Sequence, residues 1–119
     1  MTLLDQLYHI SDRTENGFTL RLDPGHFIYK AHFPGQPITP GVVIIQIALE
    51  LLELLMDRPV QLSSIRNVKF LHVIDPDETP DLKYEYHKLS TEEEQVKVQV
   101  EVSGGEVVFA KISLLCSLM

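Results

Sequence analysis

Residues 42–57 read VVIIQIALELLELLMD, and this stretch decides how the rest of the chain has to be arranged. Its polar side chains are spaced 4, 3 and 4 residues apart, which places them on one stripe of a helix. They are Gln46, Glu50, Glu53 and Asp57. All the other side chains are apolar, so most of the helix circumference must be covered by other parts of the protein. We therefore predict a long central helix over 42–57.

The segments around this helix favour an antiparallel sheet. Valines at 96, 98, 100 and 102 alternate with polar residues, as in a strand with one exposed face. Similar patterns predict strands over 18–22, 64–74, 81–88, 95–102 and 107–118, with a hairpin turn at 103–106. We also expect a short amphipathic helix over 3–10 and an extended piece over 27–30. A sheet that curls around an apolar helix buries both, so the predicted fold class is α+β, with an antiparallel sheet wrapped around a long central helix.

Length and charge restrict the function classes. A chain of 119 residues allows one domain, expected over 1–119. Its 10 basic and 17 acidic residues give a net charge of −7, which argues against binding nucleic acid or an anionic membrane surface. No apolar run is long enough for a membrane span, and no secretory signal is recognised. The single cysteine, Cys116, forms no internal disulfide and is expected to be a buried apolar residue. We expect a soluble cytoplasmic protein.

Residues 32–41, HFPGQPITPG, hold three prolines and two glycines. Proline fixes φ and lacks an N–H donor, so this segment is expected to be a stiff, irregular loop. Together with Val42, the segment resembles the signature of the β-hydroxyacyl-acyl-carrier-protein dehydratases of fatty acid biosynthesis. That signature is His-Phe-Pro-Gly, one residue, Pro, two residues, Pro-Gly-Val, followed by an apolar helix that carries an acid. All its framework positions are present here.

The resemblance implies a hotdog fold and a reaction. Members of this family usually form homodimers with one continuous sheet and two active sites at the interface, where the loop histidine meets the helix acid of the other subunit. We accordingly expect a homodimer or a higher even-numbered homo-oligomer. The implied substrate is a β-hydroxyacyl thioester on acyl carrier protein or coenzyme A, and the products are the trans-2-enoyl thioester and water. No cofactor or metal is implied.

The chemistry assigns roles to the matched residues. Histidine titrates near neutrality, so His32 is expected to be the base that removes the proton next to the thioester carbonyl. The backbone N–H of Gly41, at the start of the helix, would donate to the carbonyl oxygen as negative charge develops on it. The resemblance places Phe33, Pro40 and Val42 in the wall of the acyl site.

The sequence departs from the family at the acid. That position, 14 residues after the histidine, is Gln46, and a carboxamide has no proton to give. One turn later, where the family commonly has glutamine, stands Glu50. Three alternatives follow: Glu50 acts as the acid, directly or through a water held by Gln46; His32 alone moves the proton; or dehydration is lost. In the third case the protein is an acyl thioesterase or an inactive partner subunit. A structural interpretation is that Glu50 belongs to a solvated stripe.

Other polar residues support less. The remaining histidines, His9, His26, His72 and His87, lack metal-ligand spacing with one another or with Cys116, so we expect no zinc site. His72 is expected to be an ordinary sheet residue. Six basic residues fall within the first 70 positions and could give a basic rim for an acidic carrier protein. They are Arg13, Arg21, Lys30, Arg58, Arg66 and Lys69.

Overall fold

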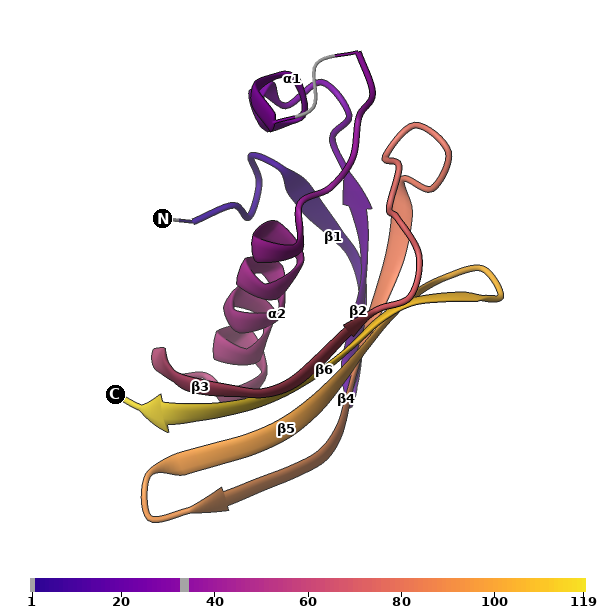
Figure 1. The fold of residues 1–119 in the computed structure, drawn as a ribbon. Helices are drawn as coiled ribbons and strands as arrows, with labels where there is room; N and C mark the ends of the chain where they lie inside the picture. Colours follow the sequence, from indigo (N-terminus) through magenta and orange to yellow (C-terminus); the bar gives the residue numbers. More distant parts are fainter. Residues whose placement is uncertain (1, 33–34) are drawn as a thin grey trace.

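The computed structural model describes residues 2–32 and 35–119, with the backbone alone at His32. The strands are β1 (Tyr8–Thr14), β2 (Gly17–Leu22), β3 (Val60–Phe70), β4 (Asp81–Glu92), β5 (Gln95–Gly104) and β6 (Val107–Leu118); the helices are α1 (Phe27–His32) and α2 (Gly41–Met56). In the described part of the chain the strands form one antiparallel sheet in the order β1-β2-β4-β5-β6-β3. The sheet curves around α2 (Figure 1), which confirms the predicted α+β architecture.

The core lies between α2 and the concave face of the sheet. The valines of β5 at 96, 98, 100 and 102 are all buried, as their alternation predicts. Opposite them, α2 buries its apolar side, including Ile47 and Leu51. Two buried tyrosines of β4 also bind the helix backbone: Tyr84 Oη donates to the carbonyl of Ile44 at 3.0 Å, and Tyr86 Oη donates to that of Ala48.

The expected helix over 3–10 is wrong. Residues 3–7 form a turn in which Leu7 N donates to the Leu3 carbonyl, and Asp5 has a left-handed φ of 65° that a continuing helix does not allow. Tyr8 then starts β1, which pairs with β2 across the turn at Asn16. Leu3 and Leu7 are buried all the same, so the apolar pattern was a burial signal rather than a helical one.

The expected extended piece over 27–30 is also wrong, because these residues lie in α1. Two side chains accept backbone N–H groups at the start of α1 and favour a helix there. The spacing of apolar residues does not reveal such hydrogen bonds. Asp23 Oδ1 accepts the N–H of Gly25, and the ring Nδ1 of His26 accepts that of Ile28 at 3.1 Å. The helix is anchored by Ile28 and Tyr29, which are both buried.

Strand positions agree with the predictions except at β1, which was not predicted as a strand, at β3, and at the end of β4. β3 is shifted four residues toward the N-terminus, because it begins directly after α2, where Val60 N donates to Glu53 Oε2 at 2.9 Å. β4 continues past its expected end at residue 88 to Glu92 through an irregularity at which Lys88 has a φ of 52°. Among the described residues, neither helix is long and apolar enough to cross a membrane.

Candidate active site

A groove of about 350 Å³ lies where α2 begins, between the loop that precedes it and the segment that follows β3. Most of its wall is apolar. The apolar lining residues are Ile38, Ile44, Phe70, Leu71, Val73 and Ile74. Gly41, Thr39 and His72 supply the remaining surface. An apolar groove that ends on a few polar groups is the usual form of a small-molecule site, and here it would accept an acyl chain.

Gly41 is the first residue of α2, and Pro40 is its N-cap. Pro40 has an extended backbone and supplies no side-chain hydrogen bond to the helix. The first N–H groups of a helix have no partner within the helix and carry partial positive charge. Gly41 also lines the groove, so the start of the helix and the apolar wall lie together.

The wall opposite the helix is held by a polar pair inside the fold. Thr39 N donates to the Ile74 carbonyl at 2.9 Å, which joins the loop to the segment after β3. The Thr39 and Tyr29 hydroxyls are hydrogen-bonded at 3.1 Å, and both residues are buried. Burial raises the pKa of Tyr29 above its ordinary value. This pair fixes α1 relative to the start of α2.

Of the residues that line the groove, the sequence analysis singled out Gly41 alone as a site residue. Phe70 is the last residue of β3 and His72 follows the strand, where Leu71 N and His72 N both donate to the Phe109 carbonyl. The signal was the exposed run Phe70-Leu71-His72-Val73, which breaks the alternation of a half-buried strand. The expectation that His72 is an ordinary sheet residue therefore fails, because His72 follows β3 and faces the groove.

Of the two other predicted acyl-site residues, Val42 and Phe33, the structure describes Val42. Val42, beside Gly41, is 72% exposed and lies on the outside of the first turn of α2. Phe33 lies outside the described residues, so its predicted role stays a prediction. The same holds for the side chain of His32, whose backbone ends α1.

Glu50 is buried at 8% exposure, so it does not belong to a solvated stripe. Its Oε1 accepts the N–H groups of Leu3 and Leu4, each at 3.0 Å, and its Oε2 accepts the same Leu3 N–H at 2.8 Å. The Tyr8 hydroxyl donates to Oε1 at 3.0 Å. Burial, and next the charge of Glu50, raise the pKa of Tyr8 above its ordinary value, so this hydroxyl stays a donor. We call Glu50, Leu3, Leu4 and Tyr8 the N-terminal clamp.

Gln46 lies one turn before Glu50 and is half-buried. Its Nε2 donates to Glu50 Oε2 at 2.9 Å. Gln46 and Glu50, which exchange places relative to the family pattern, are thus hydrogen-bonded to each other. Through Glu50 they are connected to the N-terminal segment. This connection was not foreseen, since residues 3–8 are more than 40 positions away in sequence.

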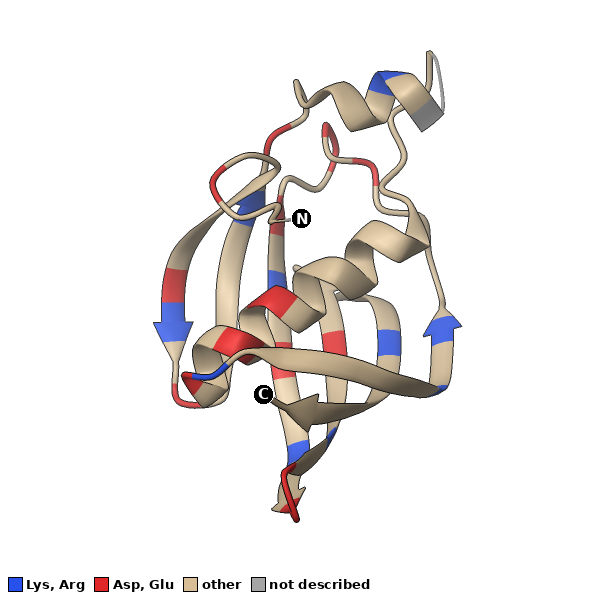
Figure 2. Cartoon of the chain, turned by 90° about the vertical axis from the view of Figure 1, so that its left-hand side faces the viewer, with Lys and Arg blue, Asp and Glu red and all other residues tan. Residues whose placement is uncertain are grey.

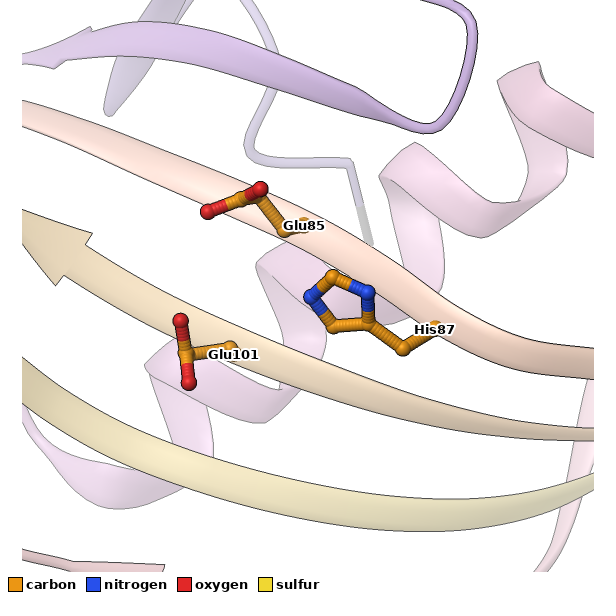
Figure 3. A group of neighbouring side chains, drawn as sticks. All are labelled: Glu85, His87 and Glu101. Atoms are coloured by element: carbon orange, nitrogen blue, oxygen red, sulfur yellow. The ribbon is translucent and has the colours of Figure 1, made fainter.

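A second cluster of polar groups lies elsewhere, on the sheet. In the part of the chain that the structure describes, Glu85, His87 and Glu101 place ligand atoms within 4.8 Å of one another (Figure 3). Sequence spacing missed this cluster because Glu85 and Glu101 face each other only through the register of β4 and β5. Lys83 Nζ already lies 3.8 Å from Glu85 Oε2. Because this lysine already supplies a cation to the Glu85 carboxylate, we assign no metal here.

The expected basic rim is not gathered on one face. Lys and Arg are distributed over separate elements in Figure 2. Arg21 pairs with Asp81 at 3.0 Å and Arg58 with Glu94 at 2.8 Å. Arg13 lies over the Phe18 ring and donates to the Leu54 carbonyl. Three of the six expected basic residues therefore already contact other groups of the same chain.

Comparisons with known proteins identify the family of this chain. The model of the ApeI-like family, described as ApeI dehydratase, matches residues 9–111. The 3-hydroxyacyl-[acyl-carrier-protein] dehydratase FabZ of Latilactobacillus sakei subsp. sakei (strain 23K) is 25% identical over 115 residues, covering 81% of this chain and 82% of that protein.

Solved structures share the fold. The dehydratase heterocomplex ApeI:P from Xenorhabdus doucetiae superposes with a TM-score of 0.62 at 20% identity, covering 92% of this chain and 94% of that one. A hypothetical thioesterase protein with coenzyme A from Streptococcus pneumoniae TIGR4 gives 0.63 at 8% identity, covering 94% and 85%. At such identities the structures show the hotdog architecture alone. Because the family model spans most of the sequence, the chain belongs to the ApeI-like dehydratase family.

Proposed function

We propose that the protein is a dehydratase that converts a β-hydroxyacyl thioester, on acyl carrier protein or coenzyme A, into the trans-2-enoyl thioester and water. The observation that carries the proposal is the groove at the start of α2. Its apolar wall suits an acyl chain, and the Gly41 N–H at its end suits a thioester carbonyl. Part of the groove is lined by residues of the segment that bears the dehydratase signature, namely Ile38, Thr39 and Gly41.

The reaction requires one base and one proton donor. Neutral His32 takes the proton from C2, the C2 electrons form the C2–C3 double bond, and the C3–O bond breaks. The Gly41 N–H stabilises charge on the carbonyl oxygen during this step. The departing hydroxyl takes the proton that His32 acquired and leaves as water. His32 is neutral again, so one imidazole serves as base and then as acid.

We assign proton return to His32 rather than to Glu50. The Glu50 carboxylate oxygens accept from four separate donors, three of which belong to the N-terminal segment. A protonated carboxyl could keep all four partners only if the Tyr8 hydroxyl turned to accept its O–H, because the two backbone N–H groups and the amide Nε2 can only donate. Glu50 is thus better suited to hold structure than to give up a proton.

A dimer fits the edge of the sheet. β3 is an edge strand of 11 residues, and an unpaired edge of that length favours pairing with a second copy. Exposed apolar side chains lie near its end and at the start of α2. They are Val42, Phe70, Leu71 and Val73. In a homodimer formed through β3, these residues would be covered and the groove would lie beside the interface.

The experiment incubates purified protein with a β-hydroxyacyl-carrier thioester and, separately, with the enoyl product, and follows both by mass spectrometry and by enoyl absorbance. Loss of water in one direction and gain in the other support the proposal. His32→Ala is the control and should be inactive while its circular dichroism matches the wild type. An active His32→Ala variant would contradict the proposed dehydratase function.

A second candidate is an inactive partner subunit. The glutamine at the family's acid position favours it, and a fold relative was solved as a heterocomplex. An unchanged substrate mass, together with co-purification of an acid-bearing hotdog chain, would support this candidate. A third, the acyl thioesterase, would instead release free thiol in the same assay.

A further inference from the structure

We propose that the outer face of the sheet carries a binding site for an oligophosphate group, in a basic groove that crosses β3, β6, β5 and β4. This site is separate from the groove at the start of α2 and does not rest on the proposed dehydratase function. We call it the outer groove. Its basic lining residues are Arg66, Lys69, Lys88, Lys97 and Lys111.

The outer groove lies on the face of the sheet that is turned away from α2 (Figure 1). On β5 the buried valines face the core, so Lys97 and Gln99 between them point to the opposite side. Two hollows of about 230 and 350 Å³ open on this side, and they share Gln99 and Ser113, so they form one groove. Pairing of two copies through β3 would extend the sheet and leave this face open.

The outer groove gathers half of the basic residues of the chain. Five of the ten Lys and Arg line it, and all five are exposed. In the part of the chain that the structure describes, none of the five forms an ion pair. Glu101 is the one acidic lining residue, so the groove has a net charge of +4 and the rest of the chain carries −11 to give −7. A small anion is therefore attracted to this groove on an otherwise acidic protein.

Two β-bulges bring cations to this face. On β3, Ile65 pairs with Leu114 and Asn67 pairs with Ser113, so Arg66 is an extra residue. On β4, His87 pairs with Gln99 and Ser90 pairs with Lys97, so two residues, Lys88 and Leu89, stand opposite Val98 alone.

Both bulges lie at the same level of the sheet, because Val98 pairs with Leu114. Val98 and Leu114 are buried, so in a regular sheet their neighbours on β3 and β4 would also face the core. A bulge changes the direction of a side chain, and here it lets Arg66 and Lys88 line the outer groove. The two bulges thus add a cation at each side of the groove.

Neutral hydrogen-bonding groups form the floor of the groove. Strand pairing places Gln99 beside Ser113 and Ser113 beside Asn67. Neighbouring strands are about 4.8 Å apart, so this row is about 10 Å long. Cations flank the row on both sides. They are Lys69 and Lys111 on one side, and Lys97, Arg66 and Lys88 on the other.

This arrangement suits a ligand with several phosphate groups. A terminal phosphate carries about −1.5 to −2 charges at pH 7 and presents several acceptor oxygens. Lys and Arg bind such oxygens with charge-assisted hydrogen bonds, and the neutral donors of the floor can bind others. A single carboxylate is too small to reach the cations on both sides of a row of about 10 Å.

An acidic protein is a poorer occupant of the outer groove. One turn of a helix, about 10 Å wide and 5.4 Å long, fills more space than either hollow. The acidic groups of such a partner that lie outside the groove would also be repelled by the charge of −11 on the rest of the chain. A compact oligophosphate meets the cations and avoids this repulsion.

The probe is inorganic tripolyphosphate, titrated into ¹⁵N-labelled wild-type protein at low ionic strength. We expect saturable binding at one site per protomer, which added salt weakens. The amide signals of Gln99 and Ser113 should shift, whereas that of Gly41, in the groove at the start of α2, should not. Absence of saturable binding, or shifts centred on Gly41, would overturn the proposal.

Paired charge removals test the site with a matched control. Arg66→Gln combined with Lys88→Gln removes both bulge cations and should raise the Kd for tripolyphosphate at least tenfold. Lys30→Gln combined with Arg21→Gln removes the same charge from exposed residues on α1 and β2, and its Kd should stay within threefold of the wild type. Equal weakening in the two double variants would show general charge attraction and overturn the site.

A second pair keeps the test valid if the bulge variant does not fold. Lys97 and Lys111 occupy regularly paired positions on β5 and β6, so Lys97→Gln combined with Lys111→Gln leaves both bulges intact. Its Kd should also rise at least tenfold, with the circular dichroism of the wild type. Wild-type affinity in this variant would contradict the proposal.

Competing anions test the ligand class. Citrate, which carries three carboxylates, should bind at least tenfold more weakly than tripolyphosphate, and so should polyglutamate. If either anion binds as tightly as tripolyphosphate, the assignment to phosphate is wrong.

Coenzyme A and pantetheine identify the source of the phosphates. If coenzyme A displaces tripolyphosphate and pantetheine, which has no phosphate, does not, the groove holds the phosphates of a coenzyme A thioester. If coenzyme A does not displace it, the ligand is a free oligophosphate. Either result supports the site, whereas displacement by pantetheine would contradict it.

Discussion

The ring of Phe70 lies directly over the Cα of Gly41, close enough that a Cβ on Gly41 would be 2.8 Å from Phe70 Cζ and 2.9 Å from Cε2. Glycine is required here because of this close approach. Strand β3 and the start of α2 meet at this contact, so the shape of the groove depends on both residues.

Gly41→Ala should push the Phe70 ring into the groove. The ring is 49% exposed and can move, so we expect a loss of about 1 kcal/mol in the free energy of unfolding and a several-fold rise in KM. Phe70→Ala makes room for the methyl group. In a double-mutant cycle the two changes should couple by about 1 kcal/mol, measured by urea denaturation. Additive effects would show that the contact is unimportant.

Glu50→Ala should destabilise the protein. The change leaves the N–H groups of Leu3 and Leu4 and the Tyr8 hydroxyl without their acceptor in a buried region. We expect a loss of about 2–4 kcal/mol in the free energy of unfolding. Glu53→Ala, which removes one acceptor from a half-buried site, should cost less than half as much. Equal losses in the two variants would contradict the clamp.

Alkaline pH should weaken the fold through its tyrosines. Burial raises the pKa of all four, Tyr8, Tyr29, Tyr84 and Tyr86, above the ordinary value of 10.0. Unfolded tyrosines lose protons near pH 10 while the native ones keep theirs, so stability is intact below that pH and falls as pH rises past it. Tyrosinate absorbance should therefore rise only together with loss of the far-ultraviolet dichroism. A native protein with several tyrosinates would disprove this.

Cys116 should be unreactive in the native state. It is fully buried, and burial raises the pKa of its thiol to about 11. Because the thiolate is the reactive form, a disulfide reagent at pH 8 should label the protein no faster than it unfolds. Labelling in 8 M urea gives the reference rate. Fast labelling without denaturant would mean that the end of β6 opens.

The edge of β3 should control the oligomeric state. Ile65, on β3, is 42% exposed, and Leu89, on the interior strand β4, is 38% exposed. In size-exclusion chromatography with light scattering, Ile65→Lys should shift the protein toward the monomer mass, because a charge opposes pairing at that edge. Leu89→Lys is the control and should keep the wild-type mass. A wild type that is already monomeric would refute the proposed dimer.

The central helix, the alternating strands and the dehydratase loop could all be predicted from the order of residues. Each is a local pattern, in which helical spacing, two-residue alternation or fixed proline and glycine positions act over a few neighbours. The apolar circumference of 42–57 even required a wrapped sheet. The same reasoning misplaced residues 3–10 and 27–30. Leu3 and Ile28 are buried, and their apolar pattern indicates burial alone. Side-chain caps and strand pairing set the backbone conformation of these two segments.

The candidate site was only partly visible at that level. His32, Gly41 and Gln46 came from the motif, but the meaning of the exchange between Gln46 and Glu50 did not. It depends on Leu3, Leu4 and Tyr8, whose donors reach Glu50 across more than 40 residues. Residue order can place a carboxylate on a helix stripe. Whether that carboxylate faces solvent, gives a proton or accepts from four donors is decided by the tertiary structure, because hydrogen-bond partners are set by distance in space.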